Sequence, residues 1–383
     1  MTYVPDRKKR IEELDILKAI GIIGMVAGHS DAPFTHFVYL FHMAIFFIAS
    51  GFCFHRQDAR SLRSAGNAVL HKIKRLWLPY FACNTFYVLL HNGFIRIGVY
   101  TGRTDLANYV ASEYAVVSTP YSPARILTGV LKGAFFRVEE QLIGPGWFLG
   151  VLFAISITYL LVELLAGRIS ANCVLPVQFV LSAILLAVGY YSSLQETAIF
   201  PYHLDKVASF YCLYHIGRML AFAKQRCAAW GGRQFLPILL VSFGLLCVFN
   251  RMGSITFAGN QYVDPAFMLA ASILGWAMVY SAAYFIKQVP FVRQCMICIG
   301  QHTLPVVLLH GLFMKLVAGF ITVWYQLPPF CVAAYPNLYG ERGAWWLLYT
   351  VVGVAGPVAL ALANQKGKGI FAARREEAAR RGA

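Results

Sequence analysis

A lysine and a histidine share one face of the first apolar stretch of the chain. Lys18 and His29 are 11 residues apart, and at about 100° per residue this spacing is close to three full helical turns. On a helix the two side chains would be aligned, ~16 Å apart along the axis. Asp15 precedes Lys18 by three residues and lies on the same side. The spacing predicts a line of polar groups that leads from the helix start to a buried imidazole, which could act as a general base.

Simpler interpretations remain open for the same residues. Asp15 and Lys18 would also form an ordinary ion pair at a membrane surface, because a lysine side chain can extend to the interface. His29 would also bond a backbone carbonyl at a helix end. Polar side chains between membrane helices often only hold the helices together.

Other ionisable residues inside apolar stretches are candidates for function, because such residues are costly in a membrane. They are His42, His215, Arg218, His310 and Lys315. His42 follows a short turn after His29, so we expect the two imidazoles at similar depth. His310 lies near the middle of its stretch. Arg218 lies near the end of its stretch, where a long side chain can reach the interface, and we keep it as a candidate substrate-binding residue.

The segment 55–76 is strongly basic. It carries Arg56, Arg60, Arg63, Lys72, Lys74 and Arg75. Such a cluster can orient the chain and contact anionic lipid. It can equally dock an anionic cytosolic ligand, since arginine and lysine bind phosphates well. Both roles are compatible.

The composition says which elements must hold these residues. Of the 383 residues, 58% are hydrophobic and only 13% are charged, against roughly 25% charged in a soluble domain. A soluble globule of this size could not hide so much apolar side chain. The net charge of +16 is distributed in short clusters between apolar runs, which indicates membrane topology rather than nucleic-acid binding.

We therefore expect an all-α integral membrane protein, a bundle of about ten transmembrane helices. Each apolar run is near the ~20 residues needed to cross a bilayer, at 14–31, 37–54, 77–95, 146–166, 172–191, 206–223, 235–250, 264–286, 302–325 and 344–363. Most of the 33 lysines and arginines fall on one side of this arrangement. The positive-inside rule then places both termini in the cytoplasm.

Two units follow from this division. Residues 1–363 form a membrane domain, with 96–145 as a long non-cytoplasmic loop that has room for short helices or a lid. Residues 364–383 form a charged cytoplasmic tail. Cys295 and Cys298 make a lone CxxC, which is too little to predict a metal site, and we expect no tightly bound cofactor. The oligomeric state is open.

Five blocks of the chain, in this order, resemble the acyltransferase-3 family of integral membrane acyltransferases, in particular its fucose 4-O-acetylase-like branch of polysaccharide O-acetyltransferases. The resemblance extends from about residue 10 to 315. Its blocks are 14–21 with Gly28-His29, then 41–52, 74–81, 146–149 and 299–310.

The resemblance implies an arginine or lysine followed, after ten residues, by a histidine essential for activity. Here that pair is Lys18 and His29. Many members have arginine at the first position, and lysine keeps the charge but loses the bidentate fork. Ser50 and Gly51 fit the family's FF-x-x-SG pattern. The resemblance also implies that Lys72, Lys74 and Arg75 meet the donor.

The implied activity is transfer of an acyl group, most often acetyl, from acyl-CoA to a saccharide hydroxyl on a cell-surface or lipid-linked glycan. We expect this in the cytoplasmic (inner) membrane of a bacterium. His29 would be a general base or a covalent relay, His42 or His310 would orient it, and Trp147 would form part of the acceptor platform. Two other classes of function stay open, a transporter or flippase for a lipid-linked glycan or small anion and a structural subunit of a polysaccharide-export complex.

Overall fold

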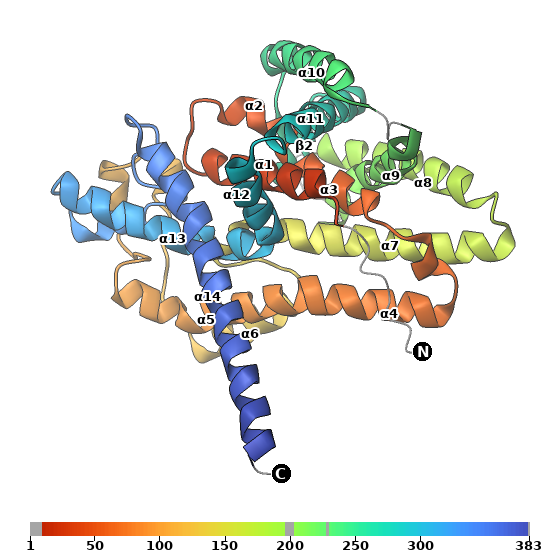
Figure 1. The fold of residues 1–383 in the computed structure, drawn as a ribbon. Helices are drawn as coiled ribbons and strands as arrows, with labels where there is room; N and C mark the ends of the chain where they lie inside the picture. Colours follow the sequence, from red (N-terminus) through yellow and green to blue (C-terminus); the bar gives the residue numbers. More distant parts are fainter. Residues whose placement is uncertain (1–9, 196–202, 227–229, 382–383) are drawn as a thin grey trace.

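The protein is a helical bundle whose longest helices cross one another at several angles (Figure 1). The computed structural model describes residues 10–195, 203–226 and 230–381. The basic residues 7–9 lie outside this part of the chain. Among the described residues the only sheet is one two-residue antiparallel hairpin, in which Ile255 pairs with Tyr262. The all-α prediction is confirmed.

Twelve helical elements make up the N-terminal half of the described chain. They are α1 (Glu12–Gly28), α2 (Thr35–Tyr39), α3 (His42–Phe52), η1 (Arg56–Ala59), α4 (Leu62–Lys72), the π-helical η2 (Ile73–Trp77), α5 (Leu78–Arg96), η3 (Thr104–Asn108), η4 (Ser112–Tyr114), α6 (Pro123–Ala134), η5 (Gln141–Gly146) and α7 (Trp147–Ile169).

The C-terminal half consists of long helices with the hairpin between two of them. Its elements are α8 (Val174–Ser193), α9 (Leu204–Arg226), α10 (Gly232–Met252), β1 (Ile255–Thr256), η6 (Phe257–Gly259), β2 (Gln261–Tyr262), α11 (Pro265–Ile286), α12 (Pro290–Gln301), α13 (Thr303–Trp324), η7 (Pro329–Ala333) and α14 (Trp345–Arg381).

Seven stretches within the described residues are long and apolar enough to cross a membrane. They are Thr35–Phe52, Gln141–Ile169, Val174–Ser193, Gly232–Met252, Pro265–Ile286, Thr303–Trp324 and Trp345–Gly367. The protein is a multi-pass integral membrane protein. The other three predicted spans correspond to α1, α5 and α9, which are not among these seven, and α1 has only 17 residues. The count of about ten therefore stays a prediction.

The basic segment 55–76, expected as a loop, is largely helical. Ser61 caps α4 by accepting a hydrogen bond from the Ser64 backbone N–H, and the Ser64 hydroxyl accepts one from the Ser61 N–H. Such a capping box supplies a helix start that hydropathy does not detect. Helix α4 continues through η2 into α5, so the three form one long rod along the bottom of Figure 1.

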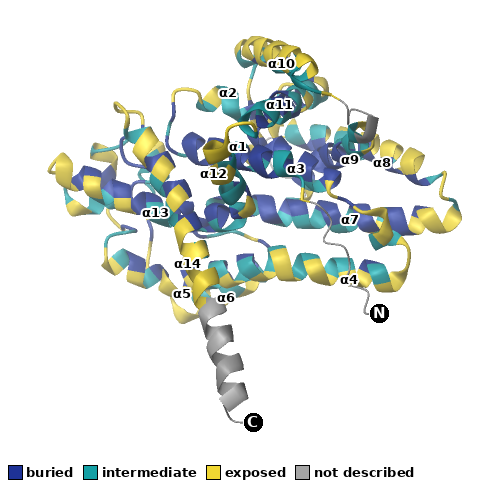
Figure 2. Ribbon diagram, in the orientation of Figure 1, coloured by how far each residue is buried: buried dark blue, intermediate teal, exposed yellow. Residues whose placement is uncertain are grey.

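Helix α1 lies at the centre of the bundle. Most of its residues are buried, including Leu17 and Ile22 with no exposed area. Figure 2 shows α1 and α3 as the darkest part of the ribbon, whereas α8 and α10 are mostly exposed. An exposed apolar face suits a helix that borders lipid, because lipid tails solvate such side chains.

Glycines allow the closest approach in the bundle, between α3 and α9. A Cβ at Gly51 would overlap the backbone carbonyl of Tyr214, and a Cβ at Gly217 would overlap the carbonyl of Ile48. Small residues at such crossings let two backbones pack directly. Gly51 of the FF-x-x-SG pattern therefore has a packing role in this fold.

Candidate functional site

The ion pair at the start of α1 is present. Lys18 Nζ lies 2.8 Å from Asp15 Oδ1, and Arg10 Nε lies 2.6 Å from Asp15 Oδ2. Asp15 is buried, whereas 27% of the Lys18 side chain is exposed. Asp15 and Lys18 therefore form the ion pair that the simpler interpretation expected, and the Lys18 side chain is partly exposed.

His29 is the first residue after α1, at the opposite end of the helix from Lys18. It lines a cavity of about 200 Å³ together with His42 and Trp147. His310 is against it, with 5.4 Å between the two ring centroids. The fold thus gathers His29, His42 and Trp147 around one small space, with His310 beside His29.

The three histidines differ in the hydrogen bonds of their rings, which determine the tautomer of each neutral ring. The Nδ1 atom of His42 faces the Val38 carbonyl at 3.1 Å, and that of His310 faces the Val306 carbonyl at 2.8 Å. A carbonyl accepts only, so in both neutral rings Nδ1 carries the hydrogen and Nε2 has a free lone pair. The His29 ring has no hydrogen bond to any described residue. Its nitrogens are therefore available to a substrate, rather than bonded to a carbonyl as the simpler interpretation suggested.

Two tyrosines that were not among the candidates from the sequence also line the cavity. Tyr39 stacks on His42, with ring centroids 4.8 Å apart, and Tyr335 comes from the segment between α13 and α14. Neither hydroxyl bonds another described residue. Tyr39 could have been noticed because it lies three residues before His42. Tyr335 lies too far along the chain for any spacing rule.

A polar network fixes the chain where α1 ends. Asn337 donates from Nδ2 to the His29 carbonyl at 3.0 Å and to Asp31 Oδ2 at 2.8 Å. Tyr114 donates its hydroxyl hydrogen to the same Asp31 oxygen at 2.8 Å. Burial and the neighbouring Asp31 raise the pKa of Tyr114, which therefore remains a donor. The network ties His29 to the loop 96–145 and to the segment after α13.

Charged groups from several elements act on Cys53, the residue that follows α3. Electrostatic interactions link the Cys53 thiol with Lys18, Lys224 and Lys72. Cys53 is exposed by its accessible area, yet desolvation by the surrounding chain raises the pKa of its thiol. The three lysines partly counter the increase and Asp15 adds to it. That Lys72 meets the donor, as the resemblance implied, stays a prediction. Lys74 and Arg75 are exposed on η2 and make no ion pair with a described residue.

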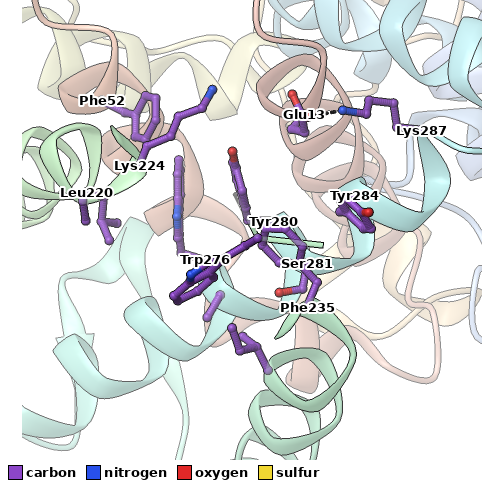
Figure 3. Close-up of a pocket in the computed structure, with 14 residues that line it drawn as sticks. Glu13, Phe52, Leu220, Lys224, Phe235, Trp276, Tyr280, Ser281, Tyr284 and Lys287 are labelled. Carbon is purple, nitrogen blue, oxygen red and sulfur yellow. Dashed lines mark hydrogen bonds and ion pairs between the residues drawn. The ribbon is translucent and has the colours of Figure 1, made fainter. Parts of the chain in front are cut away.

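A second cavity, of about 310 Å³, has Lys224 in its lining (Figure 3). Aromatic side chains from α3, α10 and α11 line it, with Lys224 and the Glu13–Lys287 ion pair at its edge. The aromatic residues of its lining include Phe52, Phe235, Trp276, Tyr280 and Tyr284. Flat apolar rings beside cations are suited to a heteroaromatic ring that carries phosphate.

The remaining candidates lie away from His29. Arg218 donates to the Phe54 carbonyl at 3.1 Å and lies over the ring of Phe222, 4.5 Å from its centroid. These contacts place Arg218 against the end of α3, outside the linings of both cavities. Ser50 is half-buried near the end of α3 and has no hydrogen bond to a described side chain.

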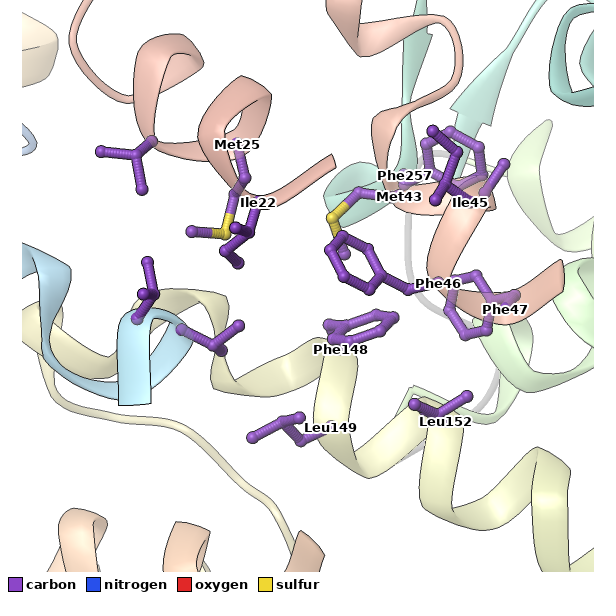
Figure 4. Close-up of a cluster of buried hydrophobic side chains, with 14 of the residues drawn as sticks. Ile22, Met25, Met43, Ile45, Phe46, Phe47, Phe148, Leu149, Leu152 and Phe257 are labelled. Carbon is purple, nitrogen blue, oxygen red and sulfur yellow. The ribbon is translucent and has the colours of Figure 1, made fainter. Parts of the chain in front are cut away.

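Buried apolar side chains fill the space between α1 and α3. Figure 4 shows Ile22 and Met25 of α1 opposite Met43 and Phe46 of α3, with Phe148 below Phe46. Met25 and Met43 also line the His29 cavity. Methionine is the most adaptable of the apolar side chains, so this part of the wall can rearrange more easily than the aromatic part.

Comparison with known proteins identifies the family. A family model described as an acyltransferase domain, that of the acyltransferase-3 family, matches residues 11–362. The chain belongs to the acyltransferase-3 family. The match includes both ends of α1 and every residue that lines the two cavities.

Family membership makes the protein a membrane acyltransferase. No curated protein and no solved structure matches the chain. The acyltransferase-3 assignment therefore gives the class of reaction, and the donor and acceptor must be argued from the residues.

Proposed function

We propose that this acyltransferase moves an acetyl or other short acyl group from acyl-CoA to a hydroxyl of a saccharide, with His29 as the central catalytic residue. The observation that carries the proposal is the His29 ring itself, which is unbonded to any described residue and faces a cavity lined by aromatic rings and by His42. Family membership favours this enzyme over the transporter and the structural subunit.

In the proposed reaction the acceptor oxygen forms a bond to the thioester carbonyl carbon, and the carbon–sulfur bond breaks. His29 takes the hydroxyl proton as the oxygen attacks and returns it to the leaving thiolate, so that the products are an ester and free CoA. A relay through an acyl group on His29 gives the same products in two steps. In both routes His310 and the Nε2 lone pair of His42 help to orient His29 or the acceptor.

The donor would bind with its nucleotide near Lys18, Lys72 and Lys224. Three ammonium groups suit the phosphates of CoA, and the cavity lined by Trp276 and Tyr280 could stack its adenine. His42 and Phe52 are ten residues apart on α3, or ~15 Å along the axis. A donor with a long flexible arm between nucleotide and thioester fits two sites separated in this way.

The acceptor would approach His29 from the side of loop 96–145. Trp147 and Tyr39 offer flat faces on which a sugar ring can stack, and Tyr114 ties this loop to the end of α1. We infer a cell-surface or lipid-linked glycan as acceptor and the bacterial inner membrane as location, because the basic segments orient the loop away from the cytoplasm.

The direct test uses purified protein, acetyl-CoA with a labelled acetyl group and a panel of glycan acceptors. His29→Ala should lower acetyl transfer at least ~100-fold, the usual minimum for loss of a general base. Lys18→Met should mainly raise the KM for the donor, because it removes a phosphate contact. Variants must be compared at equal amounts of folded protein. Wild-type transfer by His29→Ala would refute the proposed site.

A further inference from the structure

Lys315 is a buried cation that the proposed reaction does not use. It lies in the middle of α13, and only 5% of the residue is exposed. Its ammonium donates to the carbonyls of Val332, Ala333 and Ala334 at 3.1, 3.0 and 2.7 Å. None of the ion pairs among the described residues includes it. A charge buried in a membrane helix is costly, so this arrangement calls for a function.

The three carbonyls belong to the end of η7, immediately before Tyr335. A lysine that binds the last carbonyls of a helical turn fixes that turn in place. The next residue, Tyr335, donates its backbone N–H to the Tyr114 carbonyl at 3.1 Å. Two residues later, Asn337 donates to the His29 carbonyl. The segment 332–337 is thus held at three points around the cavity.

The Tyr335 hydroxyl has room only because residue 144 is glycine. A Cβ at Gly144 would lie 2.7 Å from that oxygen, which is closer than such atoms can approach. Gly144 and Tyr335 both line the cavity that contains His29. The hydroxyl bonds no described residue. An O–H donor and an imidazole, neither bonded to a described residue, therefore line the same cavity. Acyl transfer can use such a pair of groups.

We propose that the Tyr335 hydroxyl donates a hydrogen bond to the acyl carbonyl oxygen in the transition state, and that Lys315 is the positioning residue that holds Tyr335 there. This inference rests on the proposed function. As the acceptor oxygen attacks, the carbonyl π electrons move onto oxygen, and Tyr335 stabilises that charge without giving up its proton. The electrons return when the carbon–sulfur bond breaks, and the thiolate takes the proton held by His29.

The first test is Tyr335→Phe, which removes one hydroxyl and leaves the ring. Loss of one oxyanion donor lowers kcat by about 100- to 1,000-fold in well-studied enzymes. We expect a fall of about 100-fold or more in kcat with little change in either KM. Tyr325→Phe, at the exposed end of α13, is the control and should keep full activity. A kcat of Tyr335→Phe within threefold of wild type would overturn the assignment.

The second test separates positioning from general stability. Lys315→Met should also lower kcat, and the double variant Lys315→Met/Tyr335→Phe should be no slower than Tyr335→Phe alone, because both changes remove the same contact. Multiplied losses in the double variant would overturn the role of Lys315. Lys315→Gln, which keeps a donor group, replaces Lys315→Met if the latter does not fold.

Gly144→Ala is an independent check, because it disturbs the hydroxyl of Tyr335 without touching Lys315. It should lower kcat in the wild-type background and have no further effect beside Tyr335→Phe. An equal fall in both backgrounds would contradict the proposal. His29→Ala belongs in the same assay, since full activity there refutes the proposed function, whereas loss there with normal activity of Tyr335→Phe refutes only this inference.

Discussion

At the scale of single residues, the site depends on which nitrogen and oxygen atoms are left without partners. His42 and His310 each use Nδ1 to bind a backbone carbonyl, so their tautomers are set by the helices that carry them. His29 lies just beyond the end of α1, and its ring makes no hydrogen bond to a described residue. No hydrogen bond to a described residue therefore fixes the tautomer of the residue that we propose as the base.

Cys53 offers a probe of the donor site. Its surroundings include Lys18, Lys224 and Lys72, so bound acyl-CoA should shield the thiol. We expect acetyl-CoA to slow its alkylation by a maleimide several-fold, in a variant that keeps only this cysteine. Because burial raises the pKa of Cys53, the thiolate form is scarce near neutral pH, and the alkylation rate should keep rising with pH beyond the usual range of a cysteine.

The control for this experiment is Cys247, an exposed cysteine on α10. Kept as the single cysteine, it should react equally fast with and without acetyl-CoA. Unchanged alkylation of Cys53 at saturating acetyl-CoA would exclude the lysine cluster as the donor site and leave the role of His29 intact.

At the scale of elements, glycines determine how closely helices approach. Lys18, Asp15 and the start of α1 are held against α12, where a Cβ at Gly300 would overlap the backbone of Asp15. The pair Gly51 and Gly217 does the same for α3 and α9. These crossings fix the two helices that carry the candidate site.

Replacing Gly51 with alanine should therefore weaken the fold rather than the chemistry. The new methyl group meets the Tyr214 backbone, which cannot move without shifting α9. Overpacking of this kind costs about 1–3 kcal/mol, so thermal unfolding in detergent should occur at a lower temperature. Gly319→Ala on α13, where no atom lies within 4 Å of the added Cβ, should leave the unfolding temperature unchanged or slightly raised. Equal behaviour of the two variants would contradict the packing role.

At the scale of the whole molecule, hydropathy predicts the fold class well, because a membrane helix needs a long apolar run. Hydropathy predicts the extent of α1 less well, because charges shorten its apolar stretch. It also misses the start of α4, which depends on the Ser61–Ser64 cap. The alignment of Lys18 with His29 by the 3.6-residue repeat stays a prediction, because His29 is the first residue beyond α1. The positions of Tyr335 and Asn337 near His29 could not be predicted from the sequence. Some 300 residues separate them from His29 along the chain, and no local pattern encodes such a contact.

The orientation of the chain is still a prediction and can be measured. In a cysteine-free variant, a single cysteine at Ser112 should react with a membrane-impermeant maleimide in intact cells, because loop 96–145 faces outward. A single cysteine at Ser64, on α4, should react only after the membrane is opened, because the basic segment stays in the cytoplasm. Labelling of position 64 in intact cells would reverse the proposed topology.

The buried side chains between α1 and α3 have a consequence for the cell. Ile22 and Met25 lie between Lys18 and His29 along the chain, and both belong to the hydrophobic core with Met43 and Phe46. Under the proposed function, only the thin arm of a bound donor would part these side chains, and they would close again when it leaves. Acyl transfer would then proceed without a continuous path for ions and water, so the membrane would keep its proton gradient.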